Sequence, residues 1–406
     1  MTSPLDGIKV VEITSIYSGP FAGMMLAELG ADVVKVEGPD GPDPVRAMGL
    51  GSGPDAVNST FYALNRGKRF VSLDAKTERG RALLGNLAAG ADVFLHNMRP
   101  GKAETLGVGY EALAERNPGL VYVAISGFGN DGPEADLPVY DYVVQAKVGM
   151  VDYQRDLDSG RSDLVHQVVV DKTAANAAVQ GVLAALLVRE RTGRGQRVDV
   201  PMISVGAAFL WPDGMAAFHA EVSPAMPPSA LPAYLTAMPS TVLVVLATTD
   251  GEIATGLLLP PWDGLCLALD RVDLVTDSRF ADQTSRVLNF PALKAEIAAE
   301  VAKYSTADVL ERFARFDFAA GPVVPRTEVH LDPTVQHLGV LGEQRVAGIG
   351  RVRQPGPQWS FAADPARVTT SIGRTGEHTR EVLAERTGLS AGDIAALVAD
   401  GVVKEP

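Results

Sequence analysis

The first 130 residues alternate between short apolar runs and longer segments in which polar and apolar residues are mixed. Between the apolar runs, residues 21–29 and 77–89 show apolar side chains at helical spacing. Five of the runs have the length and composition of buried strands, namely 8–13, 31–37, 70–73, 92–96 and 120–126. This alternation predicts an α/β fold with a Rossmann-like, parallel sheet.

Three of the predicted strands run directly into loops that are rich in turn residues. These loops have the sequences SIYSGP, HNMRPG and SGFGNDGP. The carboxyl ends of parallel strands lie along one edge of a sheet, and ligands of such folds bind there. We therefore expect the three loops to surround a binding site.

The pattern changes twice in the second half of the chain. Residues 222–240 are rich in proline, which is typical of a linker or a lid. Two apolar strands and three helical segments follow, and a further change of character occurs near Asp332. We predict a large domain built from both chain ends, residues 1–221 and 332–406, with the linker and a smaller α/β domain at 222–331.

Composition and charge narrow the function classes. The 406 residues carry a formal net charge of −13, which provides no overall basic field for nucleic acid or an anionic membrane. The single cysteine, Cys266, excludes internal disulfides and cysteine-rich metal sites, and its apolar setting predicts a buried thiol. The six histidines form no H-x-x-x-H pair, so surface or capping roles are the simplest interpretation and no metal is expected. No signal peptide or apolar run of membrane-spanning length is visible, and we expect a cytoplasmic protein.

Two common catalytic or cofactor motifs are missing. Glu37, at the end of the second predicted strand, resembles the acid that binds ribose in dinucleotide-binding folds, but SGPFAG does not match G-x-G-x-x-G. The segment MISVG around Ser204 lacks the first glycine of a hydrolase nucleophile elbow. Both features disfavour an NAD-dependent enzyme and a serine hydrolase.

A carboxylate precedes the most apolar helix of the chain. Residues 173–191 are alanine-rich and have apolar side chains at helical spacing, which places Asp171 at the N-cap or in the first turn. An aspartate there can simply cap the helix. It can also be a nucleophile that the positive end of the helix dipole keeps ionised. The local pattern alone leaves both interpretations open.

Eight segments along the chain together identify a family. They are PLDGIKVVEI, SGPFAGMMLAELGADVVKVE, NRGKRFVSLDAKTERGRALL, NMRPG, NPGLVYVAISGFG, PVYDYVVQA, GVLAALLVRERTGRGQ and GEHTREVL. In this order they resemble the family III CoA-transferases, which include formyl-CoA:oxalate and carnitine CoA-transferases. The resemblance covers nearly the whole chain and implies an interlocked homodimer.

The resemblance implies which residues act. The family's nucleophile is an aspartate ten residues before the glycine of the G-[IV]-L-A-A-L helix, which is Asp171 before Gly181. It would pass CoA from an acyl-CoA donor to a carboxylic acid through an aspartyl anhydride and an aspartyl-CoA thioester, with CoA as acyl carrier and no metal. Tyr140 and Lys172 are weaker candidates for substrate contacts. The family pattern places CoA against Ile16, Tyr17, Ser18, Leu73, Lys76, Asn97, Met98, Arg99, Leu106 and Phe128.

The same resemblance includes an alternative reaction and some departures. α-Methylacyl-CoA racemases share the fold and transfer an α-proton by means of a histidine and an aspartate. Here Tyr140 stands where their histidine would be, and a phenol, whose ordinary pKa is about 10, is a poor base near neutral pH. Gly38 and Thr105 replace arginines of some relatives, which implies different phosphate contacts and no transfer of oxalate or formate specificity.

Overall fold

The computed structural model describes residues 3–48, 58–156, 159–213, 242–258, 261–346, 350–363 and 371–406. The chain divides into two compact units. The first comprises Met1–Met150, Leu164–Phe209 and Gln336–Pro406, and the second comprises Val151–Asp163 and Leu210–Val335. The proline-rich residues 222–240, predicted to be a linker or lid, lie outside the described residues, so that role stays a prediction.

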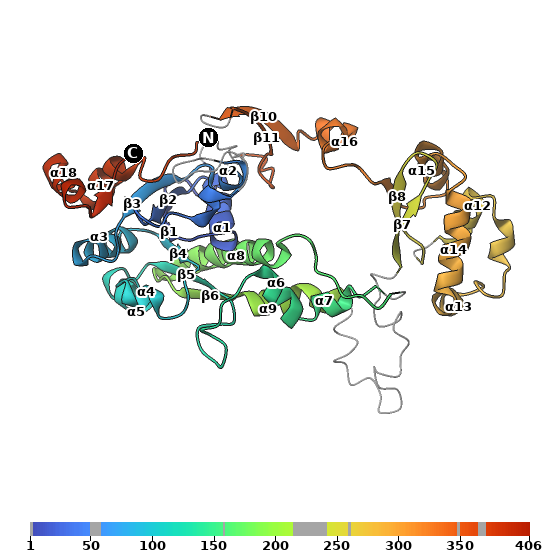
Figure 1. Cartoon of the computed structure of the whole chain (residues 1–406), viewed down its shortest axis with the longest axis horizontal. Helices are drawn as coiled ribbons and strands as arrows, with labels where there is room; N and C mark the ends of the chain where they lie inside the picture. Colours follow the sequence, from blue (N-terminus) through green and yellow to red (C-terminus); the bar gives the residue numbers. More distant parts are fainter. Residues whose placement is uncertain are drawn as a thin grey trace. The chain divides into compact units, whose positions relative to one another are not determined.

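A seven-stranded sheet forms the centre of the first unit (Figure 1). Its order is β12-β3-β2-β1-β4-β5-β6, and every neighbouring pair is parallel except β12 with β3. The strands are β1 (Lys9–Ile13), β2 (Asp32–Glu37), β3 (Arg69–Leu73), β4 (Val93–His96), β5 (Val121–Ser126), β6 (Arg197–Pro201) and β12 (Val403–Lys404). The predicted α/β fold is confirmed. After β1, β2 and β3 are added on one side of β1, and β4, β5 and β6 are then added on its other side, so the strand order switches between β1 and β4.

Helices cover both faces of this sheet (Figure 1). α3 (Glu78–Ala89) and α5 (Tyr110–Arg116) lie on one side, while α1 (Ser18–Glu28) and α8 (Val169–Thr192) pack against each other on the opposite side. The other helices described in this unit are α2 (Ser59–Asn65), α4 (Lys102–Thr105), α6 (Asp141–Lys147), α9 (Met202–Leu210), α17 (Thr379–Thr387) and α18 (Ala391–Ala399), and a hairpin joins β10 (Leu341–Val346) to β11 (Gly350–Pro355).

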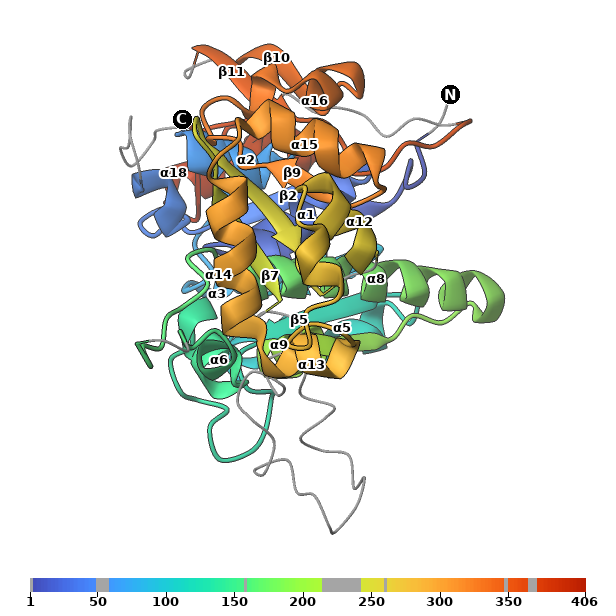
Figure 2. The same cartoon turned by 90° about the vertical axis from the view of Figure 1, so that its right-hand side faces the viewer.

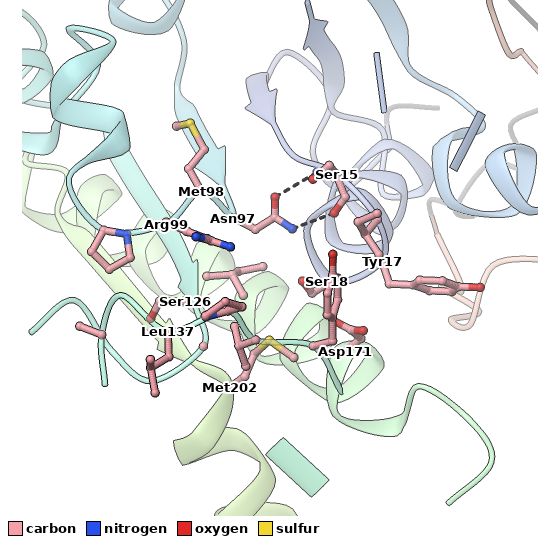
Figure 3. Close-up of a pocket in the computed structure, with 18 residues that line it drawn as sticks. Ser15, Tyr17, Ser18, Asn97, Met98, Arg99, Ser126, Leu137, Asp171 and Met202 are labelled. Atoms are coloured by element: carbon pink, nitrogen blue, oxygen red, sulfur yellow. Dashed lines mark hydrogen bonds between the residues drawn. The ribbon is translucent and has the colours of Figure 1, made fainter. Parts of the chain in front are cut away.

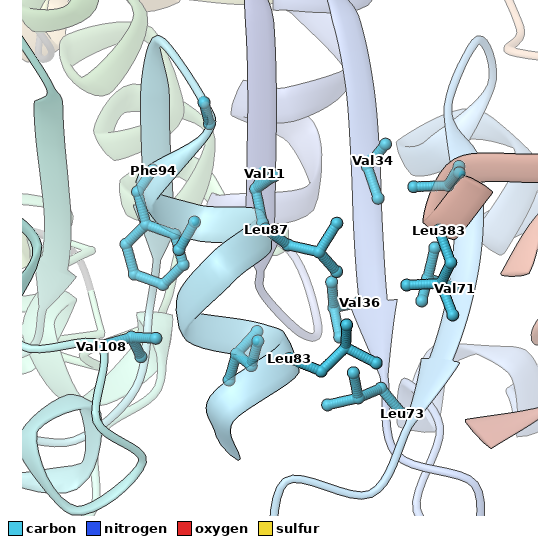
Figure 4. Packing of buried hydrophobic residues seen from close by; sticks show 14 of the residues in the cluster. Val11, Val34, Val36, Val71, Leu73, Leu83, Leu87, Phe94, Val108 and Leu383 are labelled. Atoms are coloured by element: carbon cyan, nitrogen blue, oxygen red, sulfur yellow. The ribbon is translucent and has the colours of Figure 1, made fainter. Parts of the chain in front are cut away.

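The main core lies beneath α3 and α17 (Figure 4). Leu83 and Leu87 of α3 point toward Val11 and Val36 of the sheet, and Leu383 of α17 packs over β3. The side chain of Thr77 caps α3 by accepting a hydrogen bond from the Gly80 N–H. These contacts fix the positions of the strands whose carboxyl ends carry the candidate site.

The second unit has its own sheet and core. β7 (Leu243–Ala247), β8 (Glu252–Gly256) and β9 (Ala320–Pro322) pair antiparallel, and α14 (Phe290–Val301) lies alongside β7 (Figure 2). The unit also contains α12 (Trp262–Ala268), α13 (Gln283–Leu288) and α15 (Thr306–Arg315), while α7 (Met150–Tyr153) and α16 (Pro333–His337) span the boundaries between the units.

Cys266 is fully buried in the core of the second unit. Burial raises the pKa of its thiol to about 12, so the thiol stays protonated at neutral pH. The prediction of a buried structural thiol is confirmed. None of the described helices is long and apolar enough to cross a membrane.

Candidate active site

A cavity of about 320 Å³ lies at the carboxyl ends of β1, β4 and β5, where the strand order reverses (Figure 3). The three loops expected to meet at this edge all contribute to its wall. Asp171, on the first turn of α8, lies at the opposite side of the cavity from Arg99 (Figure 3). The position agrees with the rule that open parallel sheets bind ligands at a topological switch point.

The loop between β1 and α1 is held by hydrogen bonds from two other segments. Asn97 accepts a hydrogen bond from the Ser15 N–H at 3.0 Å and donates its amide to the Ser15 carbonyl at 2.8 Å (Figure 3). The carboxylate of Asp43 accepts the N–H of Ile16 at 3.1 Å. Ile16 has a φ of 71°, which costs a β-branched residue about 1–3 kcal/mol. The surrounding hydrogen bonds therefore hold this loop in a strained conformation at the edge of the cavity.

Buried charges lie directly beneath this loop. Lys35 contacts Asp43 at 3.0 Å and donates to the Thr14 carbonyl at 2.7 Å, and its side chain is fully buried. Lys68, also fully buried, contacts Glu12 at 2.8 Å. Burial lowers the pKa of Lys68 to about 8, although the neighbouring Glu12 acts in the opposite direction. The network is an internal support for the loop, because Asp43 joins the Lys35 ammonium to the Ile16 amide.

Glu37 is part of a second buried pair and does not face a ligand. Its carboxylate accepts from the Arg46 guanidinium at 2.9 and 2.7 Å and from the Asp43 N–H at 3.0 Å. A ribose would have to displace a fully buried arginine from this carboxylate. The geometry agrees with the sequence argument against a dinucleotide-binding role for this acid.

Asp171 does not cap its own helix. α8 begins at Val169, two residues before the aspartate, and its N-cap residue makes no side-chain hydrogen bond. Instead, Asp141 at the start of α6 accepts the N–H groups of Val170 at 2.7 Å and Asp171 at 3.0 Å. The capping interpretation of Asp171 is therefore wrong, because a carboxylate from another helix satisfies the free amides.

The electrostatic environment of Asp171 shifts the pKa of its carboxyl. Burial raises the pKa of this carboxyl to about 6, and the charge of Asp141 acts in the same direction. The Ser18 hydroxyl and N–H, at the start of α1, act in the opposite direction and lower the pKa of this carboxyl. The pKa is raised rather than lowered, but it stays below 7, so the carboxyl is mostly ionised at neutral pH, as the sequence argument expected.

Gln145 connects Asp141 to the segment that leads into α8. It donates to the Asp141 carboxylate at 2.5 Å and to the Gln167 carbonyl at 3.2 Å, and its side-chain oxygen accepts the Val165 N–H at 2.9 Å. Gln145 and Asp141 are both buried on α6. They fix the approach of the chain to α8 and thereby the position of Asp171.

His96 holds the second loop of the site. Its Nδ1 accepts the Met98 N–H at 3.2 Å, so its Nε2 carries the proton toward the Tyr122 hydroxyl at 2.9 Å. Burial lowers the pKa of His96 to about 4, which keeps the ring neutral at physiological pH. The interpretation of this histidine as a surface residue is wrong, because β4 ends inside the protein.

The structure brings most, but not all, of the predicted residues to this cavity. Those in its wall are Ile16, Tyr17, Ser18, Asn97, Met98, Arg99, Tyr140 and Asp171. Arg99 forms no ion pair with any carboxylate of the described residues, so its charge is available to an anionic ligand.

Five predicted residues lie outside the cavity wall. Leu73 is buried in the core at the end of β3, and Lys76 is exposed in the turn that follows. Leu106 packs against the same core, and Phe128 lies in the loop after β5 with the Lys147 ammonium 4.7 Å from its ring centroid. Lys172 is exposed, with its ammonium 3.5 Å from the Gln167 side-chain oxygen.

Asp141, Gln145 and Asp43 are functional candidates that the sequence did not reveal. Each acts by accepting or donating hydrogen bonds at a backbone segment distant in sequence, and no local motif marks such a contact. Ser126 and Met202 also line the cavity, at the ends of β5 and β6. The arrangement offers one buried, ionisable carboxylate beside the amides of a helix start and a cation across the cavity. It suits nucleophilic attack on an activated acyl group of an anionic ligand.

The chain is similar to several known proteins. The family model of CoA-transferase family III matches residues 5–379. The chain is 32% identical to a succinate–glutarate CoA-transferase of Agrobacterium fabrum over 94% of its length and 95% of the relative's. It is 35% identical to a Mycobacterium tuberculosis protein named "Probable fatty acyl-CoA transferase", over 74% of this chain and 77% of the relative's. A crystal structure of a variant of Rv3272 from Mycobacterium tuberculosis superposes with a TM-score of 0.80 at 30% identity and covers 94% and 99% of the two chains.

Proposed function

The chain belongs to CoA-transferase family III, and we propose that Asp171 is the nucleophile through which it moves CoA from an acyl-CoA donor to a carboxylic acid. The observation that carries this proposal is the position of the Asp171 carboxyl. It is buried, with an exposed fraction of 8%, yet it lines the cavity that the predicted CoA loops surround.

The proposed reaction has four acyl-transfer steps. An Asp171 oxygen attacks the thioester carbonyl of the donor, the C–S bond breaks, and CoA leaves as a thiolate from an aspartyl–acyl anhydride. The thiolate attacks the aspartyl carbonyl, which forms an aspartyl-CoA thioester and releases the donor acid. The acceptor carboxylate attacks this thioester, releases the thiolate and forms a second anhydride. The thiolate then attacks the acceptor's acyl carbon and restores the Asp171 carboxylate.

The environment of Asp171 supports both of its roles. A carboxylate that is partly desolvated is a better nucleophile than one exposed to water, and its raised pKa of about 6 reflects that desolvation. The Ser18 N–H and hydroxyl, which lower the pKa of this carboxyl, would stabilise negative charge that develops on the aspartyl oxygen. Burial also limits the access of water, which would hydrolyse an anhydride.

CoA would lie along the carboxyl edge of the sheet. We assign its contacts to the loops at 15–18 and 97–99, with Arg99 as the phosphate-binding cation across the cavity from the nucleophile. Lys76, Leu73, Leu106 and Phe128 lie outside the cavity wall, and their assignment to CoA rests on the family resemblance. The same resemblance carries the proposal of an interlocked homodimer, which sedimentation velocity would test.

Mass spectrometry after incubation with a panel of acyl-CoA donors tests the nucleophile. Hydroxylamine should convert an activated Asp171 into a hydroxamate on the peptide that contains residues 169–192, and Asp171→Ala should abolish it. The absence of any adduct, together with exchange of the α-hydrogen of a branched acyl-CoA for deuterium, would replace this proposal by the racemase alternative.

A further inference from the structure

A second cavity, of about 460 Å³, lies between α1, α2 and β11 in the first unit. Most of its wall is apolar or aromatic. The contributing side chains include Phe21, Met24, Tyr62, Ala63, Leu64 and Val352. A cavity of this size has room for roughly 15 water molecules at about 30 Å³ each, far more than a two-carbon diacid requires.

Two residues connect this cavity to the proposed nucleophile. Tyr17 lines both the cavity that contains Asp171 and the second cavity, and Figure 3 shows its ring directed away from Asn97 and Met98. Lys172, the residue directly after Asp171, also lines the second cavity. Tyr17 is therefore a wall shared by the cavity that Asp171 lines and the second, apolar cavity.

Two of the three cationic side chains in the wall are already paired with carboxylates. Arg66 pairs with Glu28 at 2.5 Å, and Arg353 pairs with Glu343 at 2.6 Å. Lys172 forms no ion pair with any carboxylate in the part of the chain that the structure describes, and its ammonium lies 3.5 Å from the neutral side-chain amide of Gln167. The cavity thus combines a mostly apolar wall with one cation, that of Lys172, which pairs with no carboxylate of the described residues.

We propose that this cavity binds the acid substrate, and that the acid is a monocarboxylic acid with an aliphatic body of several carbons. Its carboxylate lies near Lys172 and Asp171, and its hydrocarbon part lies among Phe21, Met24 and Leu64. This assignment rests on the proposed function, because it needs an acyl intermediate on Asp171. Succinate and glutarate fit less well, since their second carboxylate would enter a wall whose other cations are already paired.

The preference for chain length is the direct consequence. Each methylene group buried in an apolar site contributes up to about fourfold in affinity. We therefore expect kcat/KM of the purified full-length enzyme to rise from acetate through butanoate and hexanoate to octanoate. Glutarate should be a poorer acceptor than hexanoate.

Ala63→Phe tests the cavity. Ala63 is exposed on α2, so the added ring would occupy the cavity without entering the hydrophobic core. The ratio of kcat/KM for octanoate to that for acetate should fall at least tenfold. The matched control is Ala112→Phe, an exposed alanine on α5, which should leave the ratio unchanged.

The outcomes separate this inference from the proposed function. If the wild-type protein forms no Asp171 adduct with any donor, the proposed function fails, and this inference fails with it. If the adduct forms but Ala63→Phe leaves the ratio unchanged, only the cavity assignment is overturned. A wild-type preference for glutarate over hexanoate would overturn the monocarboxylic class. Lys172→Met should raise KM for every acid by a similar factor, since it removes the cation and not the apolar wall.

Discussion

Replacing Asp171 by asparagine should make the protein more stable at neutral pH. The folded-state pKa of about 6 exceeds the ordinary value of 3.8 by about two units, which corresponds to about 3 kcal/mol at 1.36 kcal/mol per unit. Keeping the Asp171 carboxylate charged therefore lowers the free energy of unfolding by about that amount. Asparagine removes the charge and retains a side-chain oxygen of similar size and position.

The pH dependence of this effect has a definite sign. An acid whose folded pKa is raised binds its proton more tightly in the folded state, so the wild type loses stability as pH rises from about 4 to about 6. The gain from Asp171→Asn should thus be absent near pH 3.5, grow across this window and stay constant above it. Thermal unfolding of both proteins, measured at half-unit pH steps, should show that the midpoint of Asp171→Asn is about 5 °C above that of the wild type at pH 7.

The control is Asp40→Asn, the same chemical change at an exposed position, which should leave the midpoint within about 1 °C. Equal or lower stability of Asp171→Asn at pH 7 would refute the argument that this carboxylate is held in an unfavourable environment. A gain that did not depend on pH would show that shape rather than charge accounts for it.

Three further predictions concern the residues that hold the site. Asp141→Asn removes the like charge beside Asp171 but keeps a capping oxygen. The acidic limb of the plot of kcat/KM against pH should therefore move to lower pH by about half to one unit. An unmoved limb would contradict the charge argument. Asn97→Ala removes two hydrogen bonds to the first loop and should raise KM for acyl-CoA about tenfold, measured by steady-state kinetics with kcat less affected. Asp43→Ala leaves the buried Lys35 without its closest carboxylate, so the free energy of unfolding measured in urea should fall by about 3–5 kcal/mol. A fall below about 1 kcal/mol would exclude a structural role for Asp43.

Much of the first unit could be predicted because its signals are local. Parallel strands buried on both faces are short apolar runs, and all five predicted strands appear within one residue or so of their expected ends. The thiol of Cys266 was likewise predictable, since its neighbours along the helix are apolar. Adjacent residues determine these features, so the sequence contains them directly.

The start of α8 shows where local signals fail. Sequence spacing suggested a helix from residue 173, yet α8 begins at Val169. β-Branched residues with no polar cap are poor helix starts by themselves. Asp141 makes this start possible by accepting the N–H groups of Val170 and Asp171 from a separate helix. Only the folded chain brings that carboxylate to those amides, and the same limitation concealed the roles of Asp43 and His96.

Asp141 acts on Asp171 in two ways, and both suit the proposed chemistry. As a hydrogen-bond acceptor it fixes the first turn of α8 and therefore the direction of the Asp171 side chain. As a buried charge it raises the pKa of that side chain, together with desolvation. A nucleophile gains reactivity from a raised pKa, but in the proposed mechanism the same carboxylate would leave again in the last step, which a much higher pKa would slow. Ser18 limits the shift, and a pKa of about 6 would keep the proposed nucleophile mostly ionised at pH 7 while retaining its capacity to leave.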